Sequence, residues 1–302
     1  MSEFVSDRKT LVFYKLLSDR NEGSRNNELD VVFRVEEYAL SSFSRSYAME
    51  GTVKIAISGL GRAGKALAEY ILEKTDDTLV CAICRDESEA AGKSIAEALK
   101  YPSKRLHACP VIPISQATSH PAMQEAEVLI DFSSSRFTAQ LCDLCCEADC
   151  GLVVCTTNHE ESAFGVMQDK ANGDHIGIVY APNITLGINL LIEVTRRLSR
   201  LLPDFDFAIM ERHRADKAPV TATAQMIASA AEDHDVSISY MRAGGYVGVH
   251  ELTAASENER ITIIHESFSR SAFANGAVLA AHFVAGKKGF FTMQDVLKSL
   301  AV

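Results

Sequence analysis

The segment VKIAISGLGRAG, residues 53–64, constrains the fold more than any other part of the chain. An apolar run breaks at Gly59, and the spacing Gly59, Gly61 and Gly64 leads into a helix-like pattern over 66–72. In a strand–turn–helix unit the first glycine permits the tight turn, the second lets the backbone approach a pyrophosphate and the third lets helix and strand pack closely. The free N–H groups at the start of the helix then face the anion. We therefore predict a dinucleotide site here, against the alternative of an ordinary glycine-rich turn.

Residues 52–181 alternate between apolar strand patterns and helical patterns. The strand candidates are 52–58, 78–84, 127–131, 151–155 and 176–180, and the helical patterns include 64–75, 135–149 and 159–172. Strands that are apolar on both faces and separated by helices indicate a buried parallel sheet. The expected fold class is α/β, a Rossmann-type doubly wound parallel sheet.

The pattern changes after a helical stretch near 187–201. Polar and apolar residues alternate early in 204–211, as in a strand with one wet face. Further strand candidates lie at 236–241, 246–254 and 259–266, and helices are expected at 270–285 and 292–299. This order predicts a second, α+β domain with a partly open sheet.

Composition and charge limit the classes of partner and the compartment that we expect for this chain. The net charge of −10 argues against a nucleic-acid binder, which needs a basic patch. We expect no membrane span and no secretory signal, because no apolar run is long enough and the start lacks a charged-then-apolar layout. Eight cysteines without a sign of export predict reduced thiols in a cytoplasmic protein.

Four of these cysteines are clustered and raise the question of a metal site. We place Cys142, Cys146 and Cys150 on one stripe of a single helix, with Cys145 off the stripe. No histidine or second cysteine pair accompanies them, so we interpret them as small apolar residues of a packed helix. The prediction is that the protein holds no metal.

The end of the second strand, where a dinucleotide fold binds the ribose, reads Cys84-Arg85-Asp86. An acidic residue there favours NAD, and a basic residue favours the 2′-phosphate of NADP. Arg85 pairs well with a phosphate, so we predict NADPH as the preferred cofactor. Asp86 is the counter-argument and leaves NADH open, and Arg85 as a solvated surface charge is the alternative.

Small polar residues follow the three later strands of the predicted parallel sheet. These stretches are 133–135, 156–158 and 182–185. Ligands of open α/β sheets lie beyond the carboxyl ends of the strands, so these side chains are candidates for contact with the nicotinamide and the substrate. Each stretch taken alone is also an ordinary turn signal.

The densest group of reactive side chains lies at 211–224. His213 and Lys217 converge if the loop curls, and Pro219 is a candidate for opening the next helix. A histidine beside a lysine suits proton delivery and carboxylate binding, and the lysine would lower the pKa of the imidazole by like-charge repulsion. A charged surface loop is the alternative. We expect His250 and His265, in apparent strands, to be packed and hydrogen-bonded.

The combination of motifs over residues 52–299 resembles the dihydrodipicolinate reductases of lysine (diaminopimelate) biosynthesis. The matching segments are 57–64, Asp131-Phe132-Ser133, 155–158, 183–189, an altered signature at 211–224, and the tail motifs 242–244, 248–251, 259–260, His265, 269–270, 273–277 and 293–297.

The resemblance implies a two-domain subunit, usually in a homotetramer, that transfers a hydride from NAD(P)H to an unsaturated cyclic imine or enamine dicarboxylate. On this basis residues 50–182 plus 271–302 form the dinucleotide-binding domain, and residues 183–270 form the substrate-binding and oligomerisation domain. Residues 1–48 are an N-terminal extension of unknown role.

The resemblance also implies roles for single residues. His213 matches the catalytic histidine, the proton donor, and Lys217 matches the lysine that binds a substrate carboxylate. The expected substrate contacts are Arg214, Thr221, Ala222 and Thr223. The expected cofactor contacts are Gly59, Leu60, Gly61, Arg62, Ala63, Gly64, Arg85, Phe132, Ser133, Thr156, Thr157, Ala181, Asn183 and Ile184.

The chain departs from the family pattern at several of these positions. Arg214 replaces a second histidine, the loop after Lys217 is shorter, and Cys155 and Asn158 replace glycines. Asparagine tolerates the left-handed backbone that glycine adopts. These changes leave two alternatives open: a paralogous reductase for another cyclic imine acid, and an NADPH-binding regulator without turnover. Arg270 either reaches the cofactor or substrate or braces the last long helix.

Overall fold

The computed structural model describes residues 51–173 and 175–300. The predicted extension 1–48 lies outside the described residues, as do 301–302 at the end of the predicted dinucleotide domain. In the described part no helix is long and apolar enough to cross a membrane.

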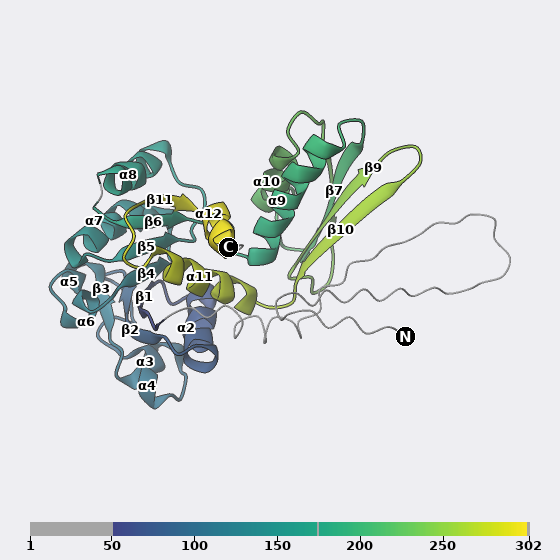
Figure 1. Ribbon diagram of the computed structural model, residues 1–302. Helices are drawn as coiled ribbons and strands as arrows, with labels where there is room; N and C mark the ends of the chain where they lie inside the picture. The colour runs from purple at the N-terminus through teal and green to yellow at the C-terminus, as the bar shows by residue number, and fades with distance from the viewer. Residues whose placement is uncertain (1–50, 174, 301–302) are drawn as a thin grey trace, which may run out of the picture. The chain divides into compact units, whose positions relative to one another are not determined.

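One part of the molecule is built around a seven-stranded sheet in which all pairs of neighbouring strands are parallel (Figure 1). Its strand order is β11-β6-β5-β4-β1-β2-β3. The strands are β1 (Lys54–Ser58), β2 (Thr78–Cys84), β3 (Val111–Pro113), β4 (Val128–Asp131), β5 (Gly151–Val154), β6 (Gly177–Tyr180) and β11 (Gly289–Thr292). The chain reverses its winding direction between β1 and β4, so the carboxyl ends of these two strands flank the topological switch point of the sheet.

Helices cover both faces of this sheet. They are α2 (Arg62–Lys74), α3 (Ile95–Leu99), α4 (Lys104–His107), α5 (Ile114–Ala117), α6 (Pro121–Gln124), α7 (Thr138–Ala148), α8 (Glu161–Asn172), α11 (Ser271–Val284) and α12 (Met293–Leu300), with a 3₁₀ turn η1 (Ser135–Phe137). One apolar cluster joins α2 and α11 to the strands, and a second joins α7 and α8 to the other face. The strands β4 and β5 are buried at every position, as a sheet covered on both faces requires.

The second half is a four-stranded mixed sheet in the order β10-β9-β7-β8. Its strands are β7 (Asp206–His213), β8 (Ser237–Arg242), β9 (Gly248–Ala255) and β10 (Arg260–Ser267), and its helices are α9 (Leu186–Leu201) and α10 (Ala222–Ala230). Both helices lie along one face of the sheet (Figure 1), and an apolar cluster that includes Phe207, Ile209 and Ile227 joins the layers. Every second residue of β7 is buried, which confirms the predicted alternation.

The fold class predicted from the sequence is confirmed, with corrections in detail. The short elements between β2 and β4, including β3, were missed because none is long enough to show a period. The strand β11 was also missed, since its four residues GFFT are too few to show an alternation.

The prediction that Cys142, Cys146 and Cys150 lie on one stripe of a single helix was wrong for Cys150. Helix α7 ends at Ala148 because Asp149 is left-handed at φ +50°, so Cys150 lies beyond the helix. Cys142 and Cys145 are buried, whereas Cys146 is only half-buried. All the cysteines are free thiols, and burial raises the pKa of Cys142 to about 12.

Candidate functional site

The glycine turn between β1 and α2 has the geometry that the sequence predicts. Gly59 has φ +89°, and a Cβ there would lie 2.8 Å from the Cα of Ser133. A Cβ at Gly64 would collide with the carbonyl oxygen of Gly59. Gly61 is the N-cap of α2, makes no side-chain cap, and has no atom within 4 Å of the place of a Cβ. The first turn of α2 therefore keeps free N–H groups facing open space, as an anion site requires.

Asp131, at the carboxyl end of β4, organises the far side of this turn. Its side chain is fully buried and accepts hydrogen bonds from the backbone N–H of Ser133 at 2.8 Å and from the Ser133 hydroxyl. The Thr156 hydroxyl lies 3.3 Å from its other oxygen. Burial raises the pKa of Asp131 although these hydrogen bonds act in the opposite direction. The carboxyl group thus fixes two of the predicted cofactor contacts.

The turn after β5 is held by a histidine that the sequence analysis did not select. His159 Nε2 lies 3.1 Å from the Thr156 hydroxyl and 3.0 Å from the Thr138 hydroxyl. Asn158 is left-handed at φ +60°, a conformation that asparagine tolerates. Thr157 is exposed.

Arg85 and Asp86, the two candidates for binding the ribose end of the dinucleotide, follow β2 and make different contacts. The Asp86 carboxylate accepts a hydrogen bond from the backbone N–H of Ser115 at 3.1 Å, at the start of α5. Arg85 is exposed, and its side chain makes no ion pair within the described residues. The guanidinium is therefore the free charged group at this strand end.

The segment after β6 contains the last three predicted cofactor contacts. Ala181 and Ile184 are buried, and Gly276 of α11 packs against the carbonyl group of Ile184 so closely that no Cβ fits. Asn183 accepts a hydrogen bond from the backbone N–H of Thr185 at 3.0 Å and donates one to the Thr223 hydroxyl at 2.9 Å. Its side chain therefore ties this segment to the first turn of α10.

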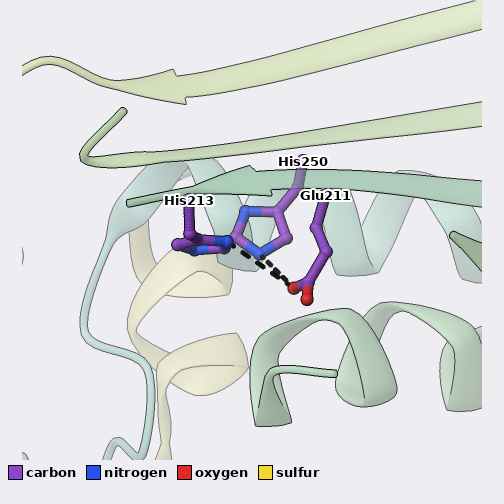
Figure 2. Close-up of side chains that lie close together, drawn as sticks. All are labelled: Glu211, His213 and His250. Carbon is purple, nitrogen blue, oxygen red and sulfur yellow. Dashed lines mark ion pairs between the residues drawn. The ribbon is translucent and has the colours of Figure 1, made fainter. Parts of the chain in front are cut away.

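His213, the last residue of β7, lies in a buried cluster with Glu211 and His250 (Figure 2). His250 is directly opposite Glu211 in the antiparallel pair of β7 and β9. The Glu211 carboxylate lies 3.8 Å from His213 Nδ1 and 3.7 Å from His250 Nε2. The two rings meet edge to face with centroids 5.1 Å apart. The strand pairing, which no local pattern reveals, brings His250 to this place.

Glu211 is the most strongly held group of the cluster. Its fully buried carboxylate accepts a hydrogen bond from Arg242 at 2.6 Å and further ones from the backbone N–H and the hydroxyl of Thr221. Burial alone raises the pKa of Glu211, but the hydrogen bonds from Arg242 and Thr221 outweigh it and hold the pKa below its ordinary value. Glu211 is therefore ionised and paired at neutral pH.

His213 is in an environment that favours the neutral imidazole. Burial is the main cause that lowers its pKa, the Glu211 charge opposes it, and Arg242 and Lys217 lower it further. The predicted effect of Lys217 is thus present but is smaller than that of burial. Gly248 lies against the other side of the ring, where a Cβ would come within 3.2 Å of Nε2.

The loop that follows β7 carries the remaining predicted substrate contacts. Lys217 is exposed, and Arg214 pairs with Asp216 at 2.9 Å. The helix α10 begins at Ala222 with Thr221 as its N-cap, so the expectation that Pro219 opens this helix was wrong. The Thr221 hydroxyl accepts from the N–H of Ala224 and donates to Glu211. The first N–H groups of α10, including that of Ala222, are not capped by it.

His250 and His265 were expected to be packed and hydrogen-bonded, and the second part holds only for His250 Nε2, which lies 3.5 Å from the Thr221 hydroxyl. Both Nδ1 atoms are buried without a partner among the described residues. Burial is the first cause that lowers the pKa of His250 to about 3 and that of His265 to about 4. His265 lies opposite His250 across β9 and β10, and its ring packs against Gly187 at the start of α9, where no Cβ fits.

The spacing of Glu211, His213 and His250 is also that of a metal site, since their ligand atoms lie within 4.8 Å of one another. Two imidazoles and a carboxylate are donors that Zn²⁺ accepts. Arg242, however, already neutralises Glu211, and a divalent cation would have to enter beside that buried guanidinium. The three residues therefore fit an ion-pair and hydrogen-bond network better than a cation site. The expectation that the protein holds no metal stays a prediction.

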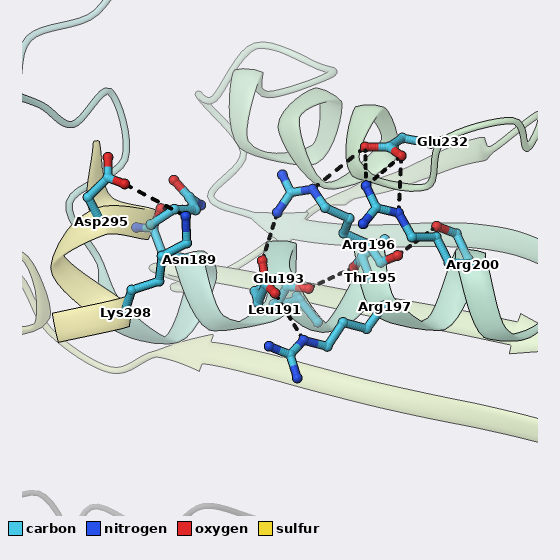
Figure 3. A network of polar contacts seen from close by, with 12 residues as sticks. Asn189, Leu191, Glu193, Thr195, Arg196, Arg197, Arg200, Glu232, Asp295 and Lys298 are labelled. Carbon is cyan, nitrogen blue, oxygen red and sulfur yellow. Dashed lines mark hydrogen bonds and ion pairs between the residues drawn. The ribbon is translucent and has the colours of Figure 1, made fainter. Parts of the chain in front are cut away.

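The other polar network of this half lies on α9 (Figure 3). Glu193 pairs with Arg196 and Arg197, and Arg200 pairs with Glu232, which follows α10, at 2.9 Å. These side chains are partly or largely exposed, so each pair contributes little to stability. We assign this network no chemistry.

Arg270 precedes α11, and its backbone carbonyl accepts from the N–H of Phe273.

Comparison with known proteins places these features in a family. The family model described as dihydrodipicolinate reductase, N-terminus, matches residues 53–184, and the model of the C-terminus matches residues 187–297.

A 4-hydroxy-tetrahydrodipicolinate reductase of Ralstonia nicotianae is 33% identical over 273 residues, which cover 81% of this chain and 99% of that protein. The enzyme of the same name from Methanopyrus kandleri is 29% identical over 267 residues, 80% of this chain and 95% of the relative.

Among solved structures, a dipicolinate-bound dihydrodipicolinate reductase from Paenisporosarcina sp. TG-14 shares the fold. Its TM-score is 0.66 at 20% identity, over 80% of this chain and 98% of that one. The two family models together span both sheets of the molecule, and the relatives match along nearly their whole length. The chain therefore belongs to the dihydrodipicolinate reductase family.

Proposed function

We propose that this chain catalyses the NADPH-dependent reduction of 4-hydroxy-tetrahydrodipicolinate, the reaction for which its curated relatives are named. The observation that carries the proposal is the placement of His213. Its imidazole lies at the end of β7 beside the loop of Lys217 and the first turn of α10, where the Thr221 cap binds the N–H of Ala224 but not those of Ala222 and Thr223. A proton donor, a cation and free N–H groups together suit a substrate with two carboxylates.

The cofactor half supports a nicotinamide dinucleotide. The uncapped start of α2 and the space beside Gly61 fit a pyrophosphate, with Leu60, Arg62 and Ala63 completing the turn. Arg85 would bind the 2′-phosphate of NADPH, because Asp86 is already hydrogen-bonded to Ser115. The side chains of Ser133 and Thr156, fixed by Asp131, would hold the nicotinamide end together with Phe132, Thr157 and residues 181–184.

The chain's own residues then account for substrate binding and proton transfer. The bound dinucleotide supplies the hydride. The Lys217 ammonium and the N–H groups of Ala222 and Thr223 bind the carboxylates. His213 takes up a proton from solvent and, because its lowered pKa makes the imidazolium a stronger acid, delivers it to the ring atom that gains electron density. Arg214 and Thr221 border this place, although the Thr221 hydroxyl is already engaged with Glu211.

The altered loop favours a second candidate, a reductase for another cyclic imine acid. Arg214 stands where the resemblance expects a histidine, and its guanidinium pairs with Asp216 rather than with a group of the site. A changed charge beside the carboxylate contacts would change the preferred substrate while the hydride chemistry stays the same.

We further propose a cytoplasmic homotetramer. The second sheet and the segments next to its strands expose large apolar side chains, namely Tyr240, Met241, Tyr246, Val247, Ile264 and Phe268. Exposed apolar groups gathered on an open sheet suit contact with further copies of the chain. Sedimentation of the purified chain tests the subunit number.

One assay tests the main proposal. The purified chain is mixed with NADPH and dihydrodipicolinate generated freshly from pyruvate and aspartate semialdehyde, and the loss of NADPH absorbance is followed. We expect oxidation of NADPH that depends on the dicarboxylate. Binding of NADPH without oxidation would instead support the second candidate or a regulator without turnover, and turnover of other cyclic imine acids separates these two.

A further inference from the structure

Arg242, the last residue of β8, connects parts of the chain that carry the proposed chemistry. We propose that Arg242, together with Glu211, is a positioning residue that holds the loop of Lys217 and the start of α10 in the geometry needed to bind a dicarboxylate. The inference rests on the proposed function and deepens it, because neither residue is assigned a contact with substrate or cofactor.

The guanidinium group of Arg242 makes hydrogen bonds in several directions at once. Nε donates to the carbonyl oxygen of Lys217 at 2.8 Å, and Nη2 donates to that of Ala218 at 3.0 Å. Nη2 also donates to Glu211 at 2.6 Å, while Nη1 donates to the carbonyl oxygen of Met241 at 3.0 Å. A planar fork of fixed donors spread over three nitrogens can hold two successive carbonyl groups and a carboxylate together, whereas the three donors of an ammonium group all lie on one nitrogen and do not reach the same set of acceptors.

Glu211 continues this connection to the other end of the loop. The backbone N–H of Thr221 donates to Oε1 at 3.1 Å, and the Thr221 hydroxyl donates to Oε2. The same hydroxyl accepts from the N–H of Ala224 at 3.2 Å and so caps α10. One buried ion pair therefore fixes the loop at Lys217 and Ala218 through Arg242, and at Thr221 through Glu211.

The loop has no regular structure of its own that would do this instead. Residues 214–221 form turns and bends between β7 and α10, and the Lys217 side chain is exposed. The packing of the sheet against α9 and α10 comes from a separate apolar cluster, which includes Phe207, Ile209 and Ile227. Since buried ion pairs add little net stability, the pair is better explained by the place it gives to the loop than by the energy of the fold.

The test compares Arg242→Lys with the wild-type chain. Lysine keeps the charge beside Glu211 but cannot hold both carbonyl groups, so the fold is retained while the loop is released. We expect faster hydrogen exchange at the amides of 214–222. We also expect a KM for the dicarboxylate that is raised about tenfold or more, as for one or two lost charged hydrogen bonds, with unchanged affinity for NADPH and a smaller change in kcat.

Arg212→Gln is the matched control. Arg212 pairs with Glu251 at 2.8 Å between β7 and β9, whereas Arg242 and Glu211 join β8 to β7 of the same sheet. Its loss removes another ion pair of the same sheet, one that is more exposed than the pair of Arg242 and Glu211, and we expect unchanged loop exchange and unchanged KM. Unchanged loop exchange in Arg242→Lys, or equal effects of the two substitutions, would overturn the inference.

Dipicolinate separates this inference from the proposed function. If the wild-type chain does not turn over dihydrodipicolinate but binds dipicolinate, the proposed function fails, and the affinity for dipicolinate replaces KM in the comparison. Weaker dipicolinate binding by Arg242→Lys alone then supports the positioning role. Equal binding by all three proteins, or no binding by the wild-type chain, contradicts it.

Discussion

The glycine turn and the end of β7 are built in different ways. The turn depends on backbone geometry within a few residues, at Gly59, Gly61 and Gly64, and on one neighbouring strand end. The cluster at Glu211 depends on side chains that come from 10 and 31 residues away, from Thr221 and Arg242. The first kind of site tolerates changes of side chain but no added Cβ at its tight contacts, whereas the second depends on the identity and the register of every member.

The largest expected effect concerns the second region. His213→Gln is expected to lower kcat by a factor of roughly 10² to 10⁴, the usual range for loss of a general acid, without changing the affinity for NADPH. Lys217→Ala is expected to act in the same direction. Steady-state kinetics and NADPH titration of each variant give both values. An unchanged kcat in His213→Gln would mean that another group donates the proton. Of the two regions compared, only the glycine turn would then keep its proposed role.

Two glycine substitutions in the first region are expected to have different effects, one on stability and one on cofactor binding. Gly64→Ala places a Cβ on the carbonyl oxygen of Gly59, so we expect a loss of several kcal/mol in the free energy of unfolding. Gly61→Ala meets no atom within 4 Å, so the fold is kept. It should nevertheless bind NADPH more weakly, since the new methyl group projects into the place proposed for the pyrophosphate.

Urea unfolding and NADPH titration measure these two effects separately. Equal stability of Gly64→Ala and the wild-type chain would contradict the close packing of α2 on the turn. Equal NADPH affinity of Gly61→Ala and the wild-type chain would place the cofactor elsewhere.

This contrast also explains what could be predicted from the sequence. The turn was predicted residue by residue, because the need for glycine at a close backbone contact is a local property that leaves a local pattern. Asn158, which stands in place of a glycine of the family pattern, is left-handed, as asparagine tolerates. The parallel sheet followed from strands that are apolar at every position, and the short elements around β3 were missed because they have no measurable period.

The cluster of the second region could be predicted only in part. His213 and Lys217 were found because they are close in sequence and match the family signature. Arg242 and His250 were seen only as family matches or as packed residues, because their contact with Glu211 requires the pairing of β7 with β8 and with β9. A single sequence does not give that register, so the ion pair that holds the loop could not be derived from it.

The buried imidazoles give a further difference that can be measured by pH. Burial lowers the pKa of His250 to about 3 and that of His265 to about 4, against about 6.5 in an unfolded chain. Below pH 6.5 the unfolded state binds more protons than the folded state, so stability is highest above that pH and falls as the pH decreases. At pH 5 the loss is about 2 kcal/mol for each histidine.

Urea unfolding at pH 7 and pH 5 measures this loss. His250→Gln removes one of these two imidazoles, so the difference in stability between the two pH values should shrink by about half of the part that His250 and His265 cause together. An unchanged difference would mean that His250 is protonated in the folded protein, contrary to its buried place beside His213.

The smallest expected effect returns to the first region and concerns the choice between the two dinucleotides. Arg85 is exposed at the end of β2, and Asp86, the competing acidic residue, is engaged with the backbone N–H of Ser115. Arg85→Ala should weaken NADPH binding about tenfold, the size of one lost charged hydrogen bond, and leave NADH binding unchanged, because only NADPH carries the 2′-phosphate. Fluorescence titration with both cofactors gives the ratio. Asp86→Asn keeps the hydrogen bond to Ser115 and serves as the control; if it alters the ratio while Arg85→Ala does not, the acidic residue and not the arginine recognises the ribose.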